Sequence, residues 1–501
     1  MSIIRRQTIL GTVFSYAGVL IGTFTQAFLY ANYLEIEVVG LFAMLFNWNM
    51  ILGYIMNLGF NNAGTKYFNV FRDEKRKHNG YLFNGLFYLL IGAILVFIIL
   101  HFFKDLILNS SVSDNNLFSE YYYLIFPLSF ASGLFYVFEN YTKGLYDTLM
   151  SNFLLQFLQR VLVLIVVLLF IMNVVNFDSM MNLWLVALST PAVFMIWYSV
   201  NLGGFSIRPS GFLMNSPFKK EFITFSGFSV ITGLSTVIIT KLDSLLVYEY
   251  LGLKQIGIYN FCLLFGSVMT ISYNVAMKAS SAIVLDAVSQ NDYKKVGVIF
   301  KKSSITQVVF GTLLLLIVWV NIDALFSFIR PEYAAGKYII LIIGIAKLFD
   351  LSSGINSLIL AYSEYYKLDA FIIVTFIGLL LLLNHLLIPI YGLNGAAMSA
   401  LVATVYYNLT RNFLIWRFFK IQPYQWAILY VVCIGSILGV LGELLPNLGQ
   451  SNLSVLLSIA YKTISLSLFF IASLYFLNVS EDMNGILKKG YKNVAKRLWL
   501  S

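Results

Sequence analysis

The chain has little charge, cysteine or histidine for its 501 residues. Only 11% of the residues are charged, whereas soluble domains carry about a quarter. The two cysteines, Cys262 and Cys433, lie inside apolar stretches, which excludes a disulfide framework. The three histidines have no metal-ligand spacing to any partner. We therefore expect no metal site and no cofactor, and the composition excludes a water-facing globular fold.

What the sequence does have is a series of apolar stretches of about 20 residues, long enough to cross a bilayer core of roughly 30 Å as helices. Continuous apolar runs exclude the alternating pattern of a membrane β-barrel. The sequence predicts an all-α integral membrane protein with about fourteen spans. These spans are residues 9–31, 39–60, 81–103, 121–142, 153–172, 182–201, 223–245, 256–277, 303–329, 337–361, 370–389, 391–416, 424–445 and 453–478.

The 33 lysine and arginine residues are distributed unevenly about these spans. An even number of spans places both termini on one side of the membrane, and 25 basic residues fall on that side. Three more lie deep inside spans, and the opposite side holds five, namely Lys104, Lys241, Lys254, Arg330 and Lys337. Because basic residues accumulate on the cytoplasmic side, we predict cytoplasmic termini. The net charge of +10 then reflects membrane topology, and nothing supports nucleic-acid binding.

The C-terminal tail, residues 479–501, has a pattern of its own. Over residues 487–499 the apolar side chains fall on one helical face and the lysines mostly on the other. This pattern is typical of an interfacial helix on an anionic membrane leaflet. A solvated basic tail fits the same residues equally well.

The chain also contains an internal repeat. Residues 33–42 (YLEIEVVGLF) match residues 250–259 (YLGLKQIGIY) at an offset of 217 without a gap. The same offset aligns residues 144–147 with 361–364, each near the end of the fourth span of its half. Six spans per copy is an even number, so we expect two lobes of the same orientation with a cavity between them. The predicted division is a lobe over 1–215, a lobe over 216–422, two additional helices over 423–478 and the tail.

Two motifs and this helical plan resemble a known family. Residues 241–243 (KLD), followed by residues 250–252 (YLG) and 256–259 (IGIY), are similar to a signature after the family's seventh helix. Residues 389–397 (PIYGLNGAA) are similar to its sequence before helix twelve. The chain resembles the polysaccharide (O-antigen or capsule, Wzx-type) flippases of the multidrug/oligosaccharidyl-lipid/polysaccharide (MOP) exporter superfamily. The plan covers the whole chain and the motifs about thirty residues.

The resemblance implies a transporter rather than an enzyme. It implies export of a polyprenyl-pyrophosphate-linked oligosaccharide across the bacterial inner membrane by alternating access, with membrane lipids and a polysaccharide polymerase as further partners. A cation-coupled multidrug antiporter of the same superfamily would need an acidic cavity, whereas the deep charges here lean positive. A peptidoglycan lipid-precursor flippase shares the plan, but residues 389–397 fit the polysaccharide branch better.

Basic residues at membrane depth are the first candidates for the site, because such charges usually face a cavity or a partner. Arg160, Lys347 and Lys462 lie deep inside spans, and Lys241 lies toward the outer end of the seventh. Arginine binds phosphate oxygens in a bidentate way and lysine offers a point charge. We interpret all four as candidates for substrate binding in the cavity, with Arg160 and Lys347 as the expected contacts of the pyrophosphate headgroup. The resemblance places Lys462 at a groove for the polyprenyl tail.

Three acids are the candidates for coupling transport to a proton or Na⁺: Asp243, Asp350 and Glu139. Each candidate also has a purely structural interpretation. Lys347 and Asp350 are three residues apart, so they share a helix face and are expected to pair. Lys241 and Asp243 are close enough to the outer interface to reach it. Lys462 is equally compatible with a buried contact to the C-terminal lobe, and Glu139 is near enough to the inner end to be hydrated.

Overall fold

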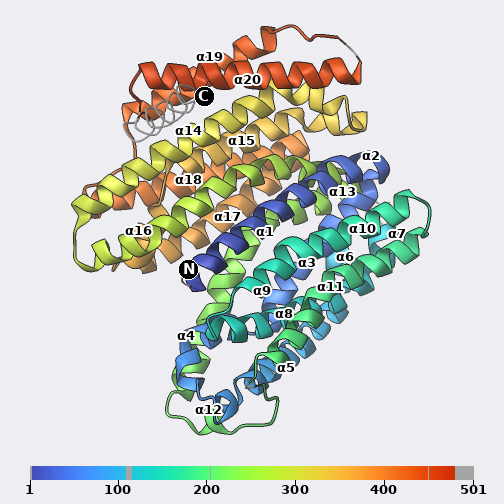
Figure 1. Cartoon of the computed structure of the whole chain (residues 1–501), viewed down its shortest axis with the longest axis vertical. Helices are drawn as coiled ribbons and strands as arrows, with labels where there is room; N and C mark the ends of the chain where they lie inside the picture. Colours follow the sequence, from blue (N-terminus) through green and yellow to red (C-terminus); the bar gives the residue numbers. More distant parts are fainter. Residues whose placement is uncertain (1–2, 109–115, 204, 450, 480–483, 485–501) are drawn as a thin grey trace, which may run out of the picture. The chain divides into compact units, whose positions relative to one another are not determined.

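The structure is a computed structural model that describes residues 3–108, 116–203, 205–449, 451–479 and 484 (Figure 1). Every regular element among these residues is helical, so the predicted all-α class is confirmed. The chain forms two compact units, Met1–Asn260 (unit 1) and Phe261–Ser501 (unit 2). The interfacial helix predicted over residues 487–499 lies outside the described residues.

Unit 1 is organised around α8, which packs against α3, α5 and α11. A π-helical segment, Thr25–Tyr30, extends α1, and a second one, Phe153–Leu158, directly precedes α10. The helices of this unit are α1 (Ile3–Phe24), α2 (Ala31–Tyr33), α3 (Ile36–Met56), α4 (Phe60–Phe71), α5 (Tyr81–Phe102), α6 (Lys104–Leu108), α7 (Asn116–Tyr121), α8 (Ile125–Gly144), α9 (Leu149–Asn152), α10 (Gln159–Ile171), α11 (Phe177–Asn201), α12 (Phe212–Asn215) and the first part of α13 (Lys219–Ser289).

Unit 2 is organised around two helices. The first, α18, packs against α15 and α17, and the second, α14, packs against α15, α19 and α20. The unit contains the remainder of α13, then α14 (Tyr293–Phe326), α15 (Lys337–Ser352), α16 (Asn356–Tyr362), α17 (Tyr366–Tyr391), α18 (Leu393–Phe419), α19 (Trp426–Leu444) and α20 (Asn452–Phe476).

Eleven helices of the described chain are long and apolar enough to cross a membrane, or twelve if the bent pair α15–α16 forms one span. The predicted fourteen is therefore approximate, for two reasons. The predicted spans 223–245 and 256–277 belong to the single element α13, which is interrupted at Gly252 (φ 81°, ψ −173°). The predicted span 391–416 corresponds to α18, whose buried residues include polar Asn408, Arg411 and Asn412 and which is not among the eleven.

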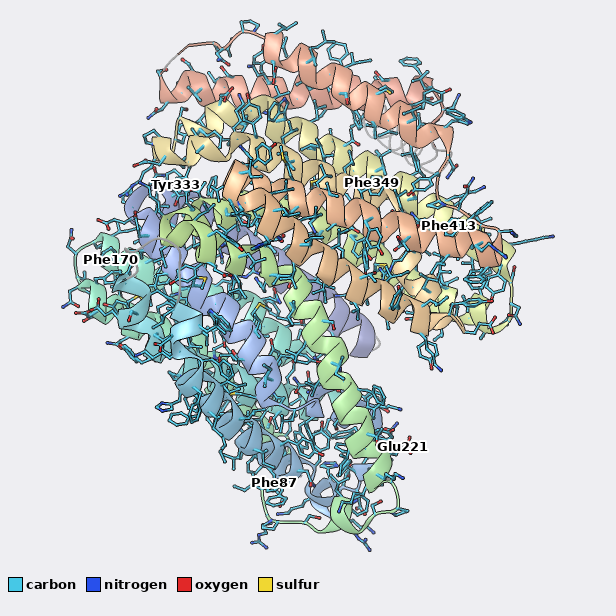
Figure 2. The ribbon with its side chains drawn as sticks, turned by 180° about the vertical axis from the view of Figure 1, so that it is seen from behind. Phe87, Phe170, Glu221, Tyr333, Phe349 and Phe413 are labelled. Carbon is cyan, nitrogen blue, oxygen red and sulfur yellow. The ribbon has the colours of Figure 1, made fainter. Side chains whose placement is uncertain are left out.

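The part of α13 before Gly252 packs onto α3 and α4 within unit 1. The Tyr67 hydroxyl donates a hydrogen bond of 2.6 Å to Oε1 of Glu221, which Figure 2 labels on this helix. The Tyr54 hydroxyl donates to the Ser229 carbonyl at 3.2 Å. At the turn between α3 and α4, Gly59 has a φ of 77°, and a methyl group on its Cα would lie 2.0 Å from the carbonyl oxygen of Ser226. The predicted seventh span is thus part of this compact unit.

The two copies of the repeated segment contact each other inside unit 1 in a reciprocal way. A methyl group on Gly40 would lie 2.0 Å from the carbonyl oxygen of Leu253, and one on Gly257 would lie 2.4 Å from the carbonyl oxygen of Ile36. Leu253 and Gly257 follow Ile36 and Gly40 by 217 residues, the repeat offset. Equivalent residues therefore exchange equivalent contacts, which supports the predicted duplication.

We expect Gly40→Ala and Gly257→Ala each to destabilise the protein by about 1–3 kcal/mol, because the added methyl must push two helix backbones apart. The two changes should not add, since either one already separates the crossing. Thermal unfolding of the purified protein in detergent measures both effects. Gly378→Ala on α17 is the matched control, because no atom lies within 4 Å of the position that its methyl would take. Equal unfolding temperatures for Gly40→Ala and this control would contradict the prediction.

Candidate functional site

Arg160 is the second residue of α10, the helix that follows directly on the π-helical turn Phe153–Leu158. Its side chain lies along α1 at two glycines that are four residues apart. The Arg160 Cδ lies 3.4 Å from the position of a methyl on Gly18, and both its Cδ and Nη1 lie 3.2 Å from that of a methyl on Gly22. The absence of a side chain at Gly22 therefore leaves room for the Arg160 side chain, which is in ordinary contact distance of Gly18.

Most N–H donors of the Arg160 guanidinium have no hydrogen-bond acceptor among the described residues. Its Nη2 donates to Oε1 of Gln156 at 3.4 Å, which is long for a hydrogen bond. A guanidinium has five N–H donors. The described part of the chain supplies neither a further hydrogen bond nor an ion pair to this group. A partly buried cation with free donors is suited to bind an anion.

The other candidates in unit 1 have nearer partners. The Lys241 ammonium lies 5.4 Å from the centroid of the Phe46 ring, within the range of a cation–π interaction. Asp243 is partly buried on the same helix, α13. Glu139 forms an ion pair with Lys143 on the next turn of α8, with Nζ and Oε1 2.9 Å apart. This local pair favours a structural role for Glu139.

In unit 2 the expected ion pair between Lys347 and Asp350 is wrong. None of the ion pairs among the described residues joins them, and Oδ1 of Asp350 accepts a hydrogen bond of 3.0 Å from Nδ2 of Asn408 on α18. The Lys347 side chain instead runs along α13, where its Cγ lies 3.6 Å from the position of a methyl on Gly266. Residues three apart can reach each other, but here different neighbouring helices draw the two side chains apart.

A chain of buried amides extends from Asp350 and was not predicted. Asn356 donates through Nδ2 to Oδ1 of Asn408 at 3.0 Å and to Oδ1 of Asn412 at 3.2 Å. Asn412 in turn donates to the Ser353 hydroxyl at 3.0 Å and to the Tyr424 hydroxyl at 2.8 Å. This network of hydrogen bonds holds the break between α15 and α16 against α18. Its sequence signal is the i, i+4 spacing of Asn408 and Asn412 inside an apolar helix.

A buried bidentate ion pair between Arg411 and Asp369 was also not predicted as part of the core. Arg411 donates through Nε to Oδ1 at 2.6 Å and through Nη2 to Oδ2 at 2.9 Å. The two residues are 5% and 8% exposed, and the guanidinium lies 4.0 Å from the centroid of the Tyr407 ring. This arginine already has a carboxylate and an aromatic ring as partners, so its role is structural.

Lys462 is buried in α20, where it is 6% exposed. Its Nζ donates a hydrogen bond of 2.9 Å to Oδ1 of Asn447 in the connection between α19 and α20. One of the three N–H donors of the ammonium is thus used within the additional pair of helices. The position is compatible with either predicted role of Lys462.

The comparisons with known proteins agree with this geometry. A family profile described as "Polysaccharide biosynthesis protein" matches residues 6–284, more than half of the chain. The chain belongs to this family. A search of curated protein sequences finds no significant match.

Several solved structures share the fold of this chain. The lipid II flippase MurJ, in an inward closed conformation, is 16% identical with a TM-score of 0.73, covering 94% of this chain and 100% of its own. An inward-facing MATE-family multidrug resistance transporter of the MOP superfamily is 12% identical with a TM-score of 0.63, covering 82% of this chain and 98% of its own. These likenesses confirm the predicted fold class. Together with the family match, they support a transporter of the MOP superfamily.

Proposed function

We propose that this protein is a flippase that moves a polyprenyl-pyrophosphate-linked oligosaccharide across the bacterial inner membrane by alternating access, for O-antigen, capsule or a related surface polysaccharide. The observation that carries the proposal is Arg160, a cation at membrane depth with one long hydrogen bond and no acidic partner among the described residues. The match to a polysaccharide biosynthesis family supports the same class of substrate.

A pyrophosphate headgroup must leave water to cross the bilayer, and its charge must be offset on the way. In the proposed mechanism the Arg160 guanidinium binds phosphate oxygens through two parallel hydrogen bonds. Lys347, Lys241 and Lys462 provide further positive charge along the path. No single one of these groups needs to bind tightly, because the substrate must also be released.

Asp350 is our first candidate for the coupling proton or Na⁺. It accepts a hydrogen bond from a neutral amide, and no cation pairs with it among the described residues. The other two acids, Asp243 and Glu139, are weaker candidates. Glu139 already has Lys143 as a counterion, and Asp243 lies closer to the outer membrane interface.

Two other functions of the superfamily predict different behaviour. A multidrug antiporter needs acids that are available to cationic drugs. Here Asp369 and Glu139 are both paired with bases, whereas Asp350 has no cationic partner among the described residues, so drug transport has to be tested directly. A flippase for a peptidoglycan lipid precursor would use the same basic residues, and the likeness to MurJ makes it the second candidate. The two lipid substrates share a pyrophosphate and a polyprenyl tail, so experiment must separate them.

We expect deletion of the gene to abolish surface polysaccharide, and the intact gene to restore it, because an untranslocated lipid-linked unit cannot be exported. Immunoblotting or gel staining of surface polysaccharide in the deletion strain measures this. The same strain should keep its drug resistance, and the gene should not replace an essential flippase of the peptidoglycan precursor. Unchanged polysaccharide with altered drug resistance would overturn the proposal in favour of an antiporter.

A further inference from the structure

An apolar slot of about 60 Å³ lies between α13, α14 and α15 in unit 2. Its lining includes Met269, Leu315, Ile340 and two glycines, Gly266 and Gly344. A buried water needs two to four polar partners, and this lining is apolar. The slot is therefore suited to hydrocarbon rather than to water.

The two glycines shape the slot. A methyl group on Gly344 would lie 2.4 Å from Cδ1 of Leu315, and one on Gly266 would lie 2.9 Å from Cγ2 of Ile343. Larger residues at these positions would force neighbouring side chains to move and would fill the space. The slot therefore exists because two of its lining residues, Gly266 and Gly344, are glycines among larger apolar residues.

The side chain of a lysine, Lys347, lies beside the slot. Ile340, Gly344 and Lys347 are spaced i, i+4, i+7, so they share one face of α15. The Lys347 Cγ lies 3.6 Å from the methyl position on Gly266, which is a lining residue. The described residues form neither a hydrogen bond nor an ion pair with the Lys347 ammonium. The aliphatic part of an unpaired lysine therefore lies beside the apolar slot.

We propose that this slot and Lys347 form a binding site for an anionic isoprenoid lipid. The slot takes the branched hydrocarbon next to the headgroup, and the Lys347 ammonium binds the first phosphate. The inference rests on the proposed function and assigns one part of that substrate to named residues. A free phosphate would leave the slot empty, and a neutral lipid would leave the cation unpaired, so an anionic amphiphile fits both features.

Photolabelling of the purified full-length protein in phosphatidylcholine nanodiscs tests the site. The probe is farnesyl pyrophosphate with a diazirine on its first isoprene unit, and labelled peptides are mapped by mass spectrometry. We expect labelling on residues 265–269, 314–318 and 340–344, competed by unlabelled polyprenyl pyrophosphate. Neutral polyprenol and inorganic pyrophosphate should compete at least about tenfold less well, since each lacks one half of the interaction.

Variants separate the two halves of the site. Lys347→Ala should lower labelling about tenfold or more, whereas Lys347→Arg should retain most of it. Gly344→Val should lower labelling by filling the slot, and Gly378→Val, at a position with no atom within 4 Å, is its control. Because Lys347→Ala only shortens a side chain, it keeps the test valid if Gly344→Val does not fold. Labelling that is unchanged by Lys347→Ala, or that neutral polyprenol competes equally, would overturn the inference.

The outcome is distinguishable from failure of the proposed function. If surface polysaccharide depends on the gene but labelling ignores Lys347, the site is wrong and the flippase proposal stands. If labelling depends on Lys347 but the deletion strain keeps its polysaccharide, the protein binds an anionic lipid at this site and its exported substrate is a different one.

Discussion

Replacing Arg160 with alanine is expected to lower export of surface polysaccharide about 10- to 100-fold. A hydrogen bond to a charged group contributes about 1.5–3 kcal/mol, and each 1.4 kcal/mol is a factor of ten. Alanine removes both the charge and the fork of donors that would face the phosphate. Among the residues that the structure describes, the guanidinium makes one long hydrogen bond, so the folded protein loses little. Polysaccharide on the surface of the complemented deletion strain, normalised to the amount of protein in the membrane, measures the effect.

Arg160→Lys should retain intermediate export, because lysine keeps the charge but not the bidentate geometry. Arg208→Ala is the matched control, since Arg208 is exposed in the connection after α11. If Arg160→Ala exports polysaccharide at the wild-type level, with a normal amount of the protein in the membrane, the role of Arg160 on which the flippase proposal rests is contradicted.

Replacing Arg411 with alanine is expected to destabilise the protein by about 3–5 kcal/mol, the range for removing one member of a buried ion pair. Asp369, which is 8% exposed in the intact protein, would lose both N–H donors that now bind its carboxylate. The aromatic contact to Tyr407 would also be lost. Thermal unfolding in detergent and the yield of folded protein after purification report the loss.

The exposed pair Lys337–Asp323 is the matched control for this prediction. Its Nζ and Oδ2 are 2.7 Å apart, but the two side chains are 28% and 77% exposed. Exposed pairs contribute about 0–1 kcal/mol, so Lys337→Ala should have a small effect. The combined change Arg411→Met and Asp369→Leu should recover much of the stability lost in Arg411→Ala, because no unpaired charge is then buried. Similar losses for Arg411→Ala and Lys337→Ala would contradict the buried-pair interpretation.

The features of the fold that the sequence predicted well are those that depend on one segment at a time. Long apolar runs specify membrane helices because the bilayer offers no hydrogen-bond partners to the backbone. The repeat was visible because residues 33–42 and 250–259 keep the same spacing. The count of spans was less certain, because α18 combines apolar length with buried polar residues whose partners lie on other helices.

At the candidate site, too, the sequence predicted the positions of residues within a helix but not their contacts with other helices. The depth of Arg160 and the absence of a nearby acid could be read from the sequence, but the close approach of its side chain to Gly22 depends on how α1 meets α10. The spacing of Lys347 and Asp350 gave their possible reach but not their direction, which the neighbours on α13 and α18 decide. The pair Arg411–Asp369 joins residues 42 positions apart and has no local signal.

The reciprocal contact of Gly40 and Gly257 has an evolutionary consequence. When identical patches meet, residue i of one subunit contacts residue j of the other and the reverse, as in an isologous homodimer. The chain retains this arrangement between Ile36 and Gly257 and between Gly40 and Leu253. Two self-associating copies joined in one chain would have this arrangement, which is what the predicted duplication implies. Joined copies can also differ in sequence, and Glu35 in one copy corresponds to Gly252 in the other.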